Sequence, residues 1–309
     1  FSPAQVALLS LPATVGGPGF TFIRDKRDNP LESTKGNYFT LDAFAAPSFL
    51  GSRSETTSAG YVPTNFGRAV AQNSTYQAFG GKGKQGRQFV FARSTTIGLE
   101  QPFKGTKVLP PGSCPVNALG EPTCAATATI PLPEQFFAGG GNSHRGFGLN
   151  QAGPRDPTTG FPLGGSALFI NNLELRLPPV TLPYFDDNIS FAVFHDMGNV
   201  FTSTNDMFHS LLHWKQRGPE LCLQDSTALQ CNYNYVSHAI GMGIRYKTPI
   251  GPVRFDFGYN LNPPAFPSCQ ATASVANQAA SGFCPADAPF FKGQHAAHFN
   301  VYFSIGQTF

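Results

Sequence analysis

The sequence predicts an all-β protein, a transmembrane antiparallel β-barrel, on three observations. The 309 residues include 30 Phe, 33 Gly and 27 Pro but a single Trp, which suits aromatic strands joined by many turns better than long helices. Apolar and polar residues alternate in several segments, as they do in strands with one apolar face. The connections between these segments alternate strictly between short and long, as in bacterial outer-membrane barrels, where short periplasmic turns follow long extracellular loops.

The pattern places nine strands along the chain. We expect them near 19–26, 36–48, 67–79, 87–101, 164–177, 188–201, 236–247, 252–260 and 296–309. The short connections fall at about 27–35, 80–86, 178–187 and 248–251, and the long ones at about 49–66, 104–163, 202–235 and 261–294. Bacterial single-chain barrels normally have an even number of strands. We therefore expect the chain to be a partial barrel, or an open sheet that a second copy or a partner completes.

The C-terminal strand has the clearest alternation. One face carries Phe299, Val301, Phe303, Ile305 and Phe309, and the opposite face carries Asn300, Tyr302, Ser304 and Thr308. The segment 252–260 repeats the pattern, with Arg254 and Asp256 on its polar face. A soluble β-sandwich would alternate in the same way. The loop rhythm favours the barrel, and the sandwich remains an alternative that predicts solubility without detergent.

Composition excludes several other classes. The net charge of +3 and the lack of a Lys/Arg block leave no electrostatic footprint for nucleic acid. No run of about 18 apolar residues occurs, which excludes a conventional transmembrane helix. The chain begins Phe-Ser-Pro without an initiator Met or a signal-peptide pattern, so we expect residues upstream of it.

Six cysteines indicate an oxidising compartment. They form three local pairs, each within one predicted long loop and none in a strand, and the pairs are Cys114/Cys124, Cys222/Cys231 and Cys269/Cys284. We expect three disulfides, since no Cys-x-x-Cys spacing favours a metal site. His209 and His213 lie four residues apart but lack the zincin Glu, which favours a short helical turn. The sequence predicts no metal and no cofactor.

One glycine-rich segment carries a recognisable motif. Residues 136–149 read Phe-Phe-Ala-Gly-Gly-Gly-Asn-Ser-His-Arg-Gly-Phe-Gly-Leu. This segment resembles the loop motif of the BamA/TamA family, the bacterial surface antigen superfamily, in which an Arg-Gly-Phe tip folds back into the barrel lumen. The tip here is Arg145, Gly146 and Phe147, with His144 where a small apolar residue is commoner. For Gly139 to Gly141, positive φ or close backbone approach is a simpler explanation than a phosphate cradle.

Other landmarks follow in the order of that family. The strand 188–201 ends Phe-His-Asp-Met-Gly-Asn-Val-Phe, the segment Thr248-Pro-Ile-Gly-Pro-Val-Arg-Phe resembles the penultimate hairpin, and the last strand ends on Phe309. The resemblance covers nearly the whole chain, so residues 1–309 are expected to form one partial barrel domain with the long loop 104–163. It implies that Phe299, Val301, Phe303, Ile305, Gly306 and Phe309 form a C-terminal assembly signal.

The arginine of the motif requires buried acceptors whatever the family. A buried unpaired charge costs several kcal/mol, on the order of 3–5 when one partner of a pair is removed. Alternation places Glu174 and Asp196 on inward faces, where a planar guanidinium could engage both carboxylates. We expect Arg145, Glu174 and Asp196 to lock the loop in the lumen, either as a purely structural clamp or as a device that sets the conformation for membrane insertion. An arginine between two carboxylates would spoil an acid role, so no enzyme is predicted.

The family resemblance implies a function and its partners. Relatives have a sixteen-stranded barrel preceded by periplasmic POTRA domains, and their weak first-to-last seam is expected to pair with strands of client proteins by β-augmentation. Gly306 is expected to allow a kink at that seam, or is simply a tolerated small residue. The expected partners are outer-membrane lipid and lipopolysaccharide, unfolded outer-membrane protein clients, and periplasmic or outer-membrane assembly partners. A two-partner-secretion type transporter and a passive outer-membrane channel are the alternatives.

Overall fold

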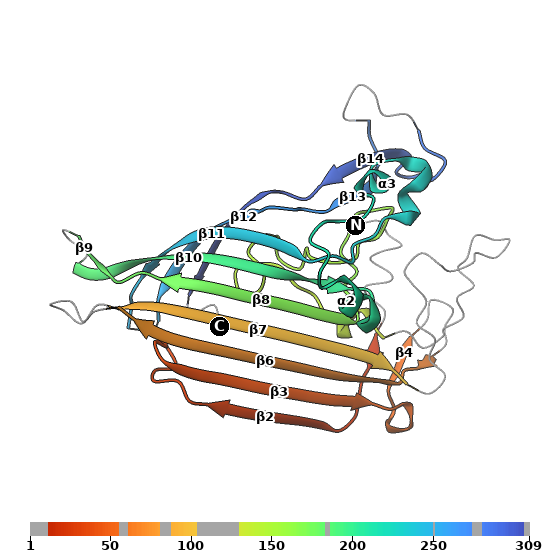
Figure 1. Cartoon of the computed structure of the whole chain (residues 1–309). Coiled ribbons are helices and arrows are strands. Elements are labelled where there is room, and N and C mark those ends of the chain that lie inside the picture. The colour runs from red at the N-terminus through yellow and green to blue at the C-terminus, as the bar shows by residue number, and fades with distance from the viewer. Residues whose placement is uncertain are drawn as a thin grey trace.

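One curved antiparallel sheet forms most of the protein (Figure 1). The structure is a computed structural model, and it describes residues 12–55, 61–80, 88–103, 130–182, 186–249, 251–273 and 280–305. The strands of the sheet are β2 (Gly19–Asp25), β3 (Gly36–Ala46), β6 (Phe66–Phe79), β7 (Phe89–Pro102), β8 (Ala167–Arg176), β10 (Asp186–Phe201), β11 (Ser237–Tyr246), β12 (Val253–Asn260) and β15 (Phe299–Ile305). They are ordered β15-β12-β11-β10-β8-β7-β6-β3-β2, and the short β9 (Val180–Leu182) pairs with β10. The predicted all-β class and all nine predicted strands are confirmed.

The register of the sheet separates an apolar outer face from a polar inner face. In β12 and β15, Phe255 opposes Phe303 on the outer face, while Arg254 opposes Ser304 on the inner face. The two phenylalanine rings lie 5.0 Å apart. A register slip of one residue would turn every one of these side chains to the other face, so the alternation fixes the pairing.

The outer face exposes a belt of apolar side chains. Members from all parts of the sheet are more than a third exposed, among them Phe20, Phe22, Phe91, Ile97, Phe191, Val193, Ile240, Met242, Ile244, Phe255, Phe299, Val301, Phe303 and Ile305. Water would disfavour a surface of this kind, whereas a bilayer favours it.

The long connections contain structure of their own. The elements outside the main sheet are β1 (Ala13–Thr14), β4 (Arg53–Glu55), β5 (Tyr61–Pro63), α2 (Thr204–Ser210), α3 (Pro219–Cys222), β13 (Ala265–Gln270), β14 (Phe290–His295) and 3₁₀ turns at Ser48–Leu50, Leu132–Glu134 and Asp225–Gln230. β1, β4 and β5 form a small sheet, and β13 pairs with β14. His209 lies in α2, and His213 follows that helix. In the described ranges, none of the helices is long and apolar enough to cross a membrane.

Two of the expected disulfides are present. Cys222 bonds to Cys231, and Cys269 bonds to Cys284. The expectation that no cysteine lies in a strand is wrong for Cys269, because the loop that carries it forms the β13–β14 hairpin. Strand propensity alone did not indicate this hairpin, since β13 contains a proline. Cys114 and Cys124 lie outside the described residues, as do Gly306 and Phe309.

The long loop between β7 and β8 packs against the inner face of the sheet. Its described part, 130–166, folds back over the sheet, and bridges join Phe136 to Gly165 and Ala138 to Ala152. A buried apolar cluster forms between loop and sheet from Ala138, Phe147, Ala152, Ile170 and Val200. The loop therefore occupies the concave side of the sheet and carries its own small core.

Candidate lumen loop-lock site

The loop reaches the inner face through a tight turn. Gly139 and Gly140 have φ angles of 113° and 103°, which side chains other than glycine rarely adopt. The amide of Gly140 donates to the carbonyl of Phe147 at 2.9 Å, so the segment between them closes into a compact tip. This geometry agrees with the conformational explanation of the glycine run.

Arg145 lies at this tip and engages two strands of the sheet. Its Nε and Nη2 donate to the two carboxylate oxygens of Asp196 on β10, each at 2.8 Å, and its Nη1 donates to Glu174 on β8 at 3.0 Å. Its backbone amide also donates to Asp196 at 2.9 Å. All three side chains are fully buried. The fork-shaped contact with Asp196 is the strongest geometry that an arginine and a carboxylate can form.

Further charged side chains complete a network around this pair. Glu174 also accepts from Arg176 at 2.8 Å and from Arg245 at 2.6 Å. Asp256 lies 3.5 Å from Arg145 and 3.9 Å from Arg245. Arg145, Arg176 and Arg245 thus face Glu174, Asp196 and Asp256, and the buried Arg254, on the same face of β12 as Asp256, adds a fourth guanidinium. Attraction between the opposite charges offsets much of the desolvation that such burial costs.

The guanidinium of Arg145 also stacks on an aromatic ring. Its central carbon lies 3.4 Å from the centre of the Phe194 ring. Phe194 is buried and is on the same strand as Asp196, two residues away. The ring covers one flat face of the guanidinium while the carboxylates occupy its edges, an arrangement that lysine could not reproduce.

His144 fits this site as a neutral side chain. Its Nδ1 accepts from the amide of Gly146 at 3.1 Å, so Nδ1 carries no proton. Its Nε2 lies 3.2 Å from the carbonyl oxygen of Ser237, which accepts a hydrogen bond from the Nε2–H group. Both ring nitrogens are thereby satisfied without a charge, and the fully buried ring packs edge-on against Phe147 at 5.0 Å between centroids.

Gly146 is held where a larger residue would not fit. A Cβ added at this position would lie 2.7 Å from the Cβ of Ala239 on β11. Its carbonyl accepts from the side-chain amides of Asn260 on β12 at 2.9 Å and Asn300 on β15 at 3.1 Å. Close approach, rather than an unusual φ angle, is the reason for glycine here.

Phe147 and Tyr302 extend the contact to the last strand. The Phe147 side chain is 2% exposed and belongs to the apolar cluster of the loop. Its carbonyl accepts a hydrogen bond from the hydroxyl of Tyr302 on β15. The tip of the loop therefore contacts β8, β10, β11, β12 and β15 together.

The structure brings together Arg145, Gly146, Phe147, Glu174 and Asp196, the five residues singled out from the sequence. Sequence reasoning missed the contribution of four inward-facing residues, namely Arg176, Arg245, Asp256 and Asn260. Alternation already placed Asp256 on the inner face, but it did not indicate which inward charges meet the loop. The residues expected as an assembly signal, Phe299, Val301, Phe303 and Ile305, lie on the outer face away from the tip.

The arrangement joins the loop to the wall of the sheet through ion pairs. The carboxylates of Glu174 and Asp196 both accept hydrogen bonds from guanidinium groups. In the part of the chain that the structure describes, no cluster of three His, Cys, Asp or Glu side chains could hold a metal ion.

Three comparisons place this architecture among known proteins. Residues 18–309 match the model of the Omp85 superfamily domain. Over 133 residues, 43% of this chain, the sequence is 26% identical to the outer membrane protein assembly factor BamA of Nitratidesulfovibrio vulgaris. The structure resembles that of BamA from Haemophilus ducreyi lacking POTRA domains 1-3, with a TM-score of 0.51 and 17% identity over 93% of this chain.

These relatives are longer than the chain described here. The matched part spans 13% of the N. vulgaris protein and 42% of the H. ducreyi chain. The likeness of fold, together with the apolar outer belt, identifies the sheet as an all-β transmembrane barrel architecture of the bacterial outer membrane.

Proposed function

The chain belongs to the Omp85 superfamily, and we propose on this basis that it acts in the assembly and insertion of outer-membrane proteins. It would do so without enzymatic chemistry, by offering the edge of its sheet to the strands of unfolded clients. The name of the N. vulgaris relative, an outer membrane protein assembly factor, supports the same role.

The observation that carries this proposal is the edge strand β15. Among the described strands, β15 pairs only with β12, so no described strand covers its other side. Its outward side chains are apolar, and each is more than half exposed. An edge of this kind, in contact with lipid, is a template on which a further strand can form by β-augmentation.

The loop lock would set the position of that edge. Asn300 and Tyr302 are the inward side chains of β15 that donate to Gly146 and Phe147. Because Arg145 holds the same tip against β8 and β10, we infer that docking of the loop fixes β15 relative to the rest of the sheet. This is the reason to favour a device for insertion over a clamp that only stabilises the barrel.

The alternative of a passive channel receives less support. An open pore needs a polar lumen that no loop fills. The described part of the long loop instead packs on the inner face through a buried ion network and an apolar cluster. The same packing does not discriminate against a two-partner-secretion transporter.

Photo-crosslinking tests the role of the edge. A photoreactive phenylalanine analogue replaces Phe303 on β15, and the matched control replaces Phe191, an outward phenylalanine on the internal strand β10. With an unfolded barrel protein supplied as client during assembly, we expect crosslinks to the client at position 303 and none above background at 191. Equal crosslinking at both positions would overturn the proposal.

A further inference from the structure

The outer face carries a cluster of polar residues within its apolar belt. We define the polar patch as Asn37, Asn73, Thr75, Arg93, Thr95 and Asn171. The register aligns these residues in two rows, with Asn37 beside Thr75 and Thr75 beside Arg93 in one, and Asn73 beside Thr95 and Thr95 beside Asn171 in the next. Charged and polar groups on the lipid side of a barrel are unfavourable, and the penalty grows with depth. The presence of the polar patch on the lipid-facing side therefore needs an explanation.

Arg93 is the centre of this patch. It shares the outward row of β7 with Phe91 and Ile97, both exposed to the surroundings of the barrel. Its Nε donates to Oδ1 of Asn171 at 3.2 Å, and the same oxygen accepts from Thr95 at 2.8 Å. No carboxylate in the described ranges pairs with Arg93. None of the described residues accepts a hydrogen bond from the terminal nitrogens of its guanidinium, so these nitrogens can bind a group outside the protein.

The position of Arg93 indicates which leaflet of the membrane it meets. It is the fifth residue of β7, close to the short connection that precedes this strand. Short connections lie on the periplasmic side. Long cationic side chains in lipid extend toward the nearer headgroup region, which here belongs to the periplasmic leaflet.

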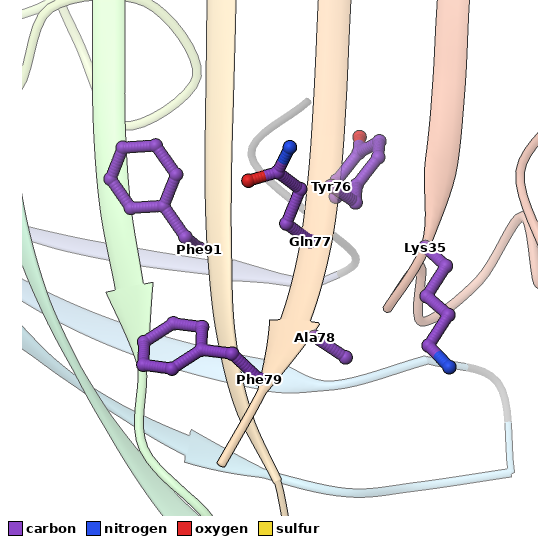
Figure 2. Close-up of a pocket in the computed structure, with 6 residues that line it drawn as sticks. All are labelled: Lys35, Tyr76, Gln77, Ala78, Phe79 and Phe91. Atoms are coloured by element: carbon purple, nitrogen blue, oxygen red, sulfur yellow. The ribbon is translucent and has the colours of Figure 1, made fainter.

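A hollow of about 610 Å³ lies beside the patch at the same end of the strands, lined by Lys35, Tyr76, Gln77, Ala78, Phe79 and Phe91. Figure 2 shows Phe79 and Phe91 on one side of Gln77 and Lys35 on the other. Gln77 opposes Phe91 in the row next to that of Thr75 and Arg93. The hollow thus combines aromatic walls with a cation at its rim.

The spacing lets both cations reach one anionic group. Lys35 precedes β3, which pairs with β6, and β6 pairs with β7. Lys35 is two strands away from Arg93 across the sheet, at about 4.8 Å per strand, and two residues away along the strand direction, at about 3.3 Å per residue. Their Cα atoms are therefore roughly 12 Å apart. Two extended side chains of this length can meet across that distance.

We propose that the outer face of β3, β6 and β7 holds one phospholipid of the periplasmic leaflet. Its phosphate lies between the Arg93 guanidinium and the Lys35 ammonium, beside the ring of Phe91, and its acyl chains run toward the middle of the membrane along Ile97. A phosphate matches two cations that have no carboxylate partner among the described residues, and the apolar row beside them matches the chains. The site is on the barrel wall, away from β15, and does not depend on the proposed assembly function.

Native mass spectrometry of the protein purified from outer membranes tests this site. The probe is phosphatidylglycerol, with diacylglycerol of the same acyl chains as the probe that lacks phosphate. We expect one phosphatidylglycerol per protein, with affinity lowered about five-fold in Arg93→Leu and in Lys35→Gln and on the order of 25-fold in the double variant. Diacylglycerol is expected to bind no better than background.

Matched controls keep the test decisive. Lys215→Gln removes an exposed cation from the segment between β10 and β11, and this variant should bind phosphatidylglycerol as the parent does. Arg93→Leu places an apolar residue among Phe91 and Ile97, so it should fold, which heat-modifiable electrophoretic mobility checks. Unchanged phosphatidylglycerol binding in the folded double variant, or equal binding of diacylglycerol, would overturn the proposal.

Discussion

Replacing Arg145 with alanine removes a guanidinium that joins the loop to both β8 and β10. Three hydrogen bonds that the Arg145 side chain donates disappear, two to Asp196 and one to Glu174. The two carboxylates are left in different situations. Glu174 keeps hydrogen bonds from Arg176 and Arg245, whereas Asp196 loses its only cation among the described residues.

The cost is therefore expected to arise mainly at Asp196. Removing one partner of a buried ion pair destabilises proteins by about 3–5 kcal/mol, because the other charge stays buried. We expect a loss of this size for docking of the loop in Arg145→Ala. The double variant Arg145→Ala/Asp196→Asn should recover a substantial part of it, while Arg145→Ala/Glu174→Gln should recover nothing.

Two measurements check the docking energy. Hydrogen exchange of residues 136–149 reports opening of the loop, and a cost of about 3–5 kcal/mol corresponds to a loss of protection of about two to four orders of magnitude. Urea unfolding, followed through the fluorescence of the single tryptophan, Trp214, reports the whole chain.

A second arginine of the same loop provides the control. Arg155 is buried and donates to the side chain of Gln151 and to the carbonyl of Gly160. Its removal leaves neutral acceptors, so Arg155→Ala should cost less, about 1–3 kcal/mol. The reasoning is refuted if Arg145→Ala and Arg155→Ala cost the same, or if Asp196→Asn fails to rescue the first.

Two further predictions concern close packing and pH. Gly146→Ala should destabilise loop docking by about 1–3 kcal/mol, since the new Cβ would lie 2.7 Å from that of Ala239, and Ala239→Gly should rescue it in hydrogen exchange. Partial burial acts to raise the pKa of Asp28, but hydrogen bonds from the hydroxyl and amide of Thr34 and the amide of Lys35 lower it to about 2. A lowered pKa stabilises the turn above the unfolded value of about 4, and this contribution disappears as the pH falls from about 4 to 2. Urea unfolding of Asp28→Asn should lack this part of the pH dependence, and a parent-like profile would contradict the assignment.

The strands could be predicted from the sequence because the alternation of apolar and polar side chains can be recognised within each segment alone. The prediction of each strand used only the residues of that strand. The same alternation predicted that the side chains of Glu174 and Asp196 point to the inner face. The partners of Arg145 beyond these two required long-range information. Asp256 and Arg245 meet the tip only because the register of β11 with β12 and the route of the loop bring them there.

The structure within the loops was the hardest part to predict. α2 and α3 are short, and short helices gain most of their stability from tertiary contacts that the sequence does not display. The β13–β14 hairpin, held by the disulfide from Cys269 to Cys284, is of the same kind. The cysteine spacing indicated a closed loop but not the strands inside it.

The hydrogen bonds from Asn300 and Tyr302 to the loop tip have a thermodynamic consequence for the edge of the sheet. A strand that displaced β15 would remove these bonds and weaken docking of the tip. By linkage, a tip that left the inner face would weaken the placement of β15 by the same free energy. Placement of β15 and docking of the loop therefore act as two coupled equilibria, and each can be measured through the other.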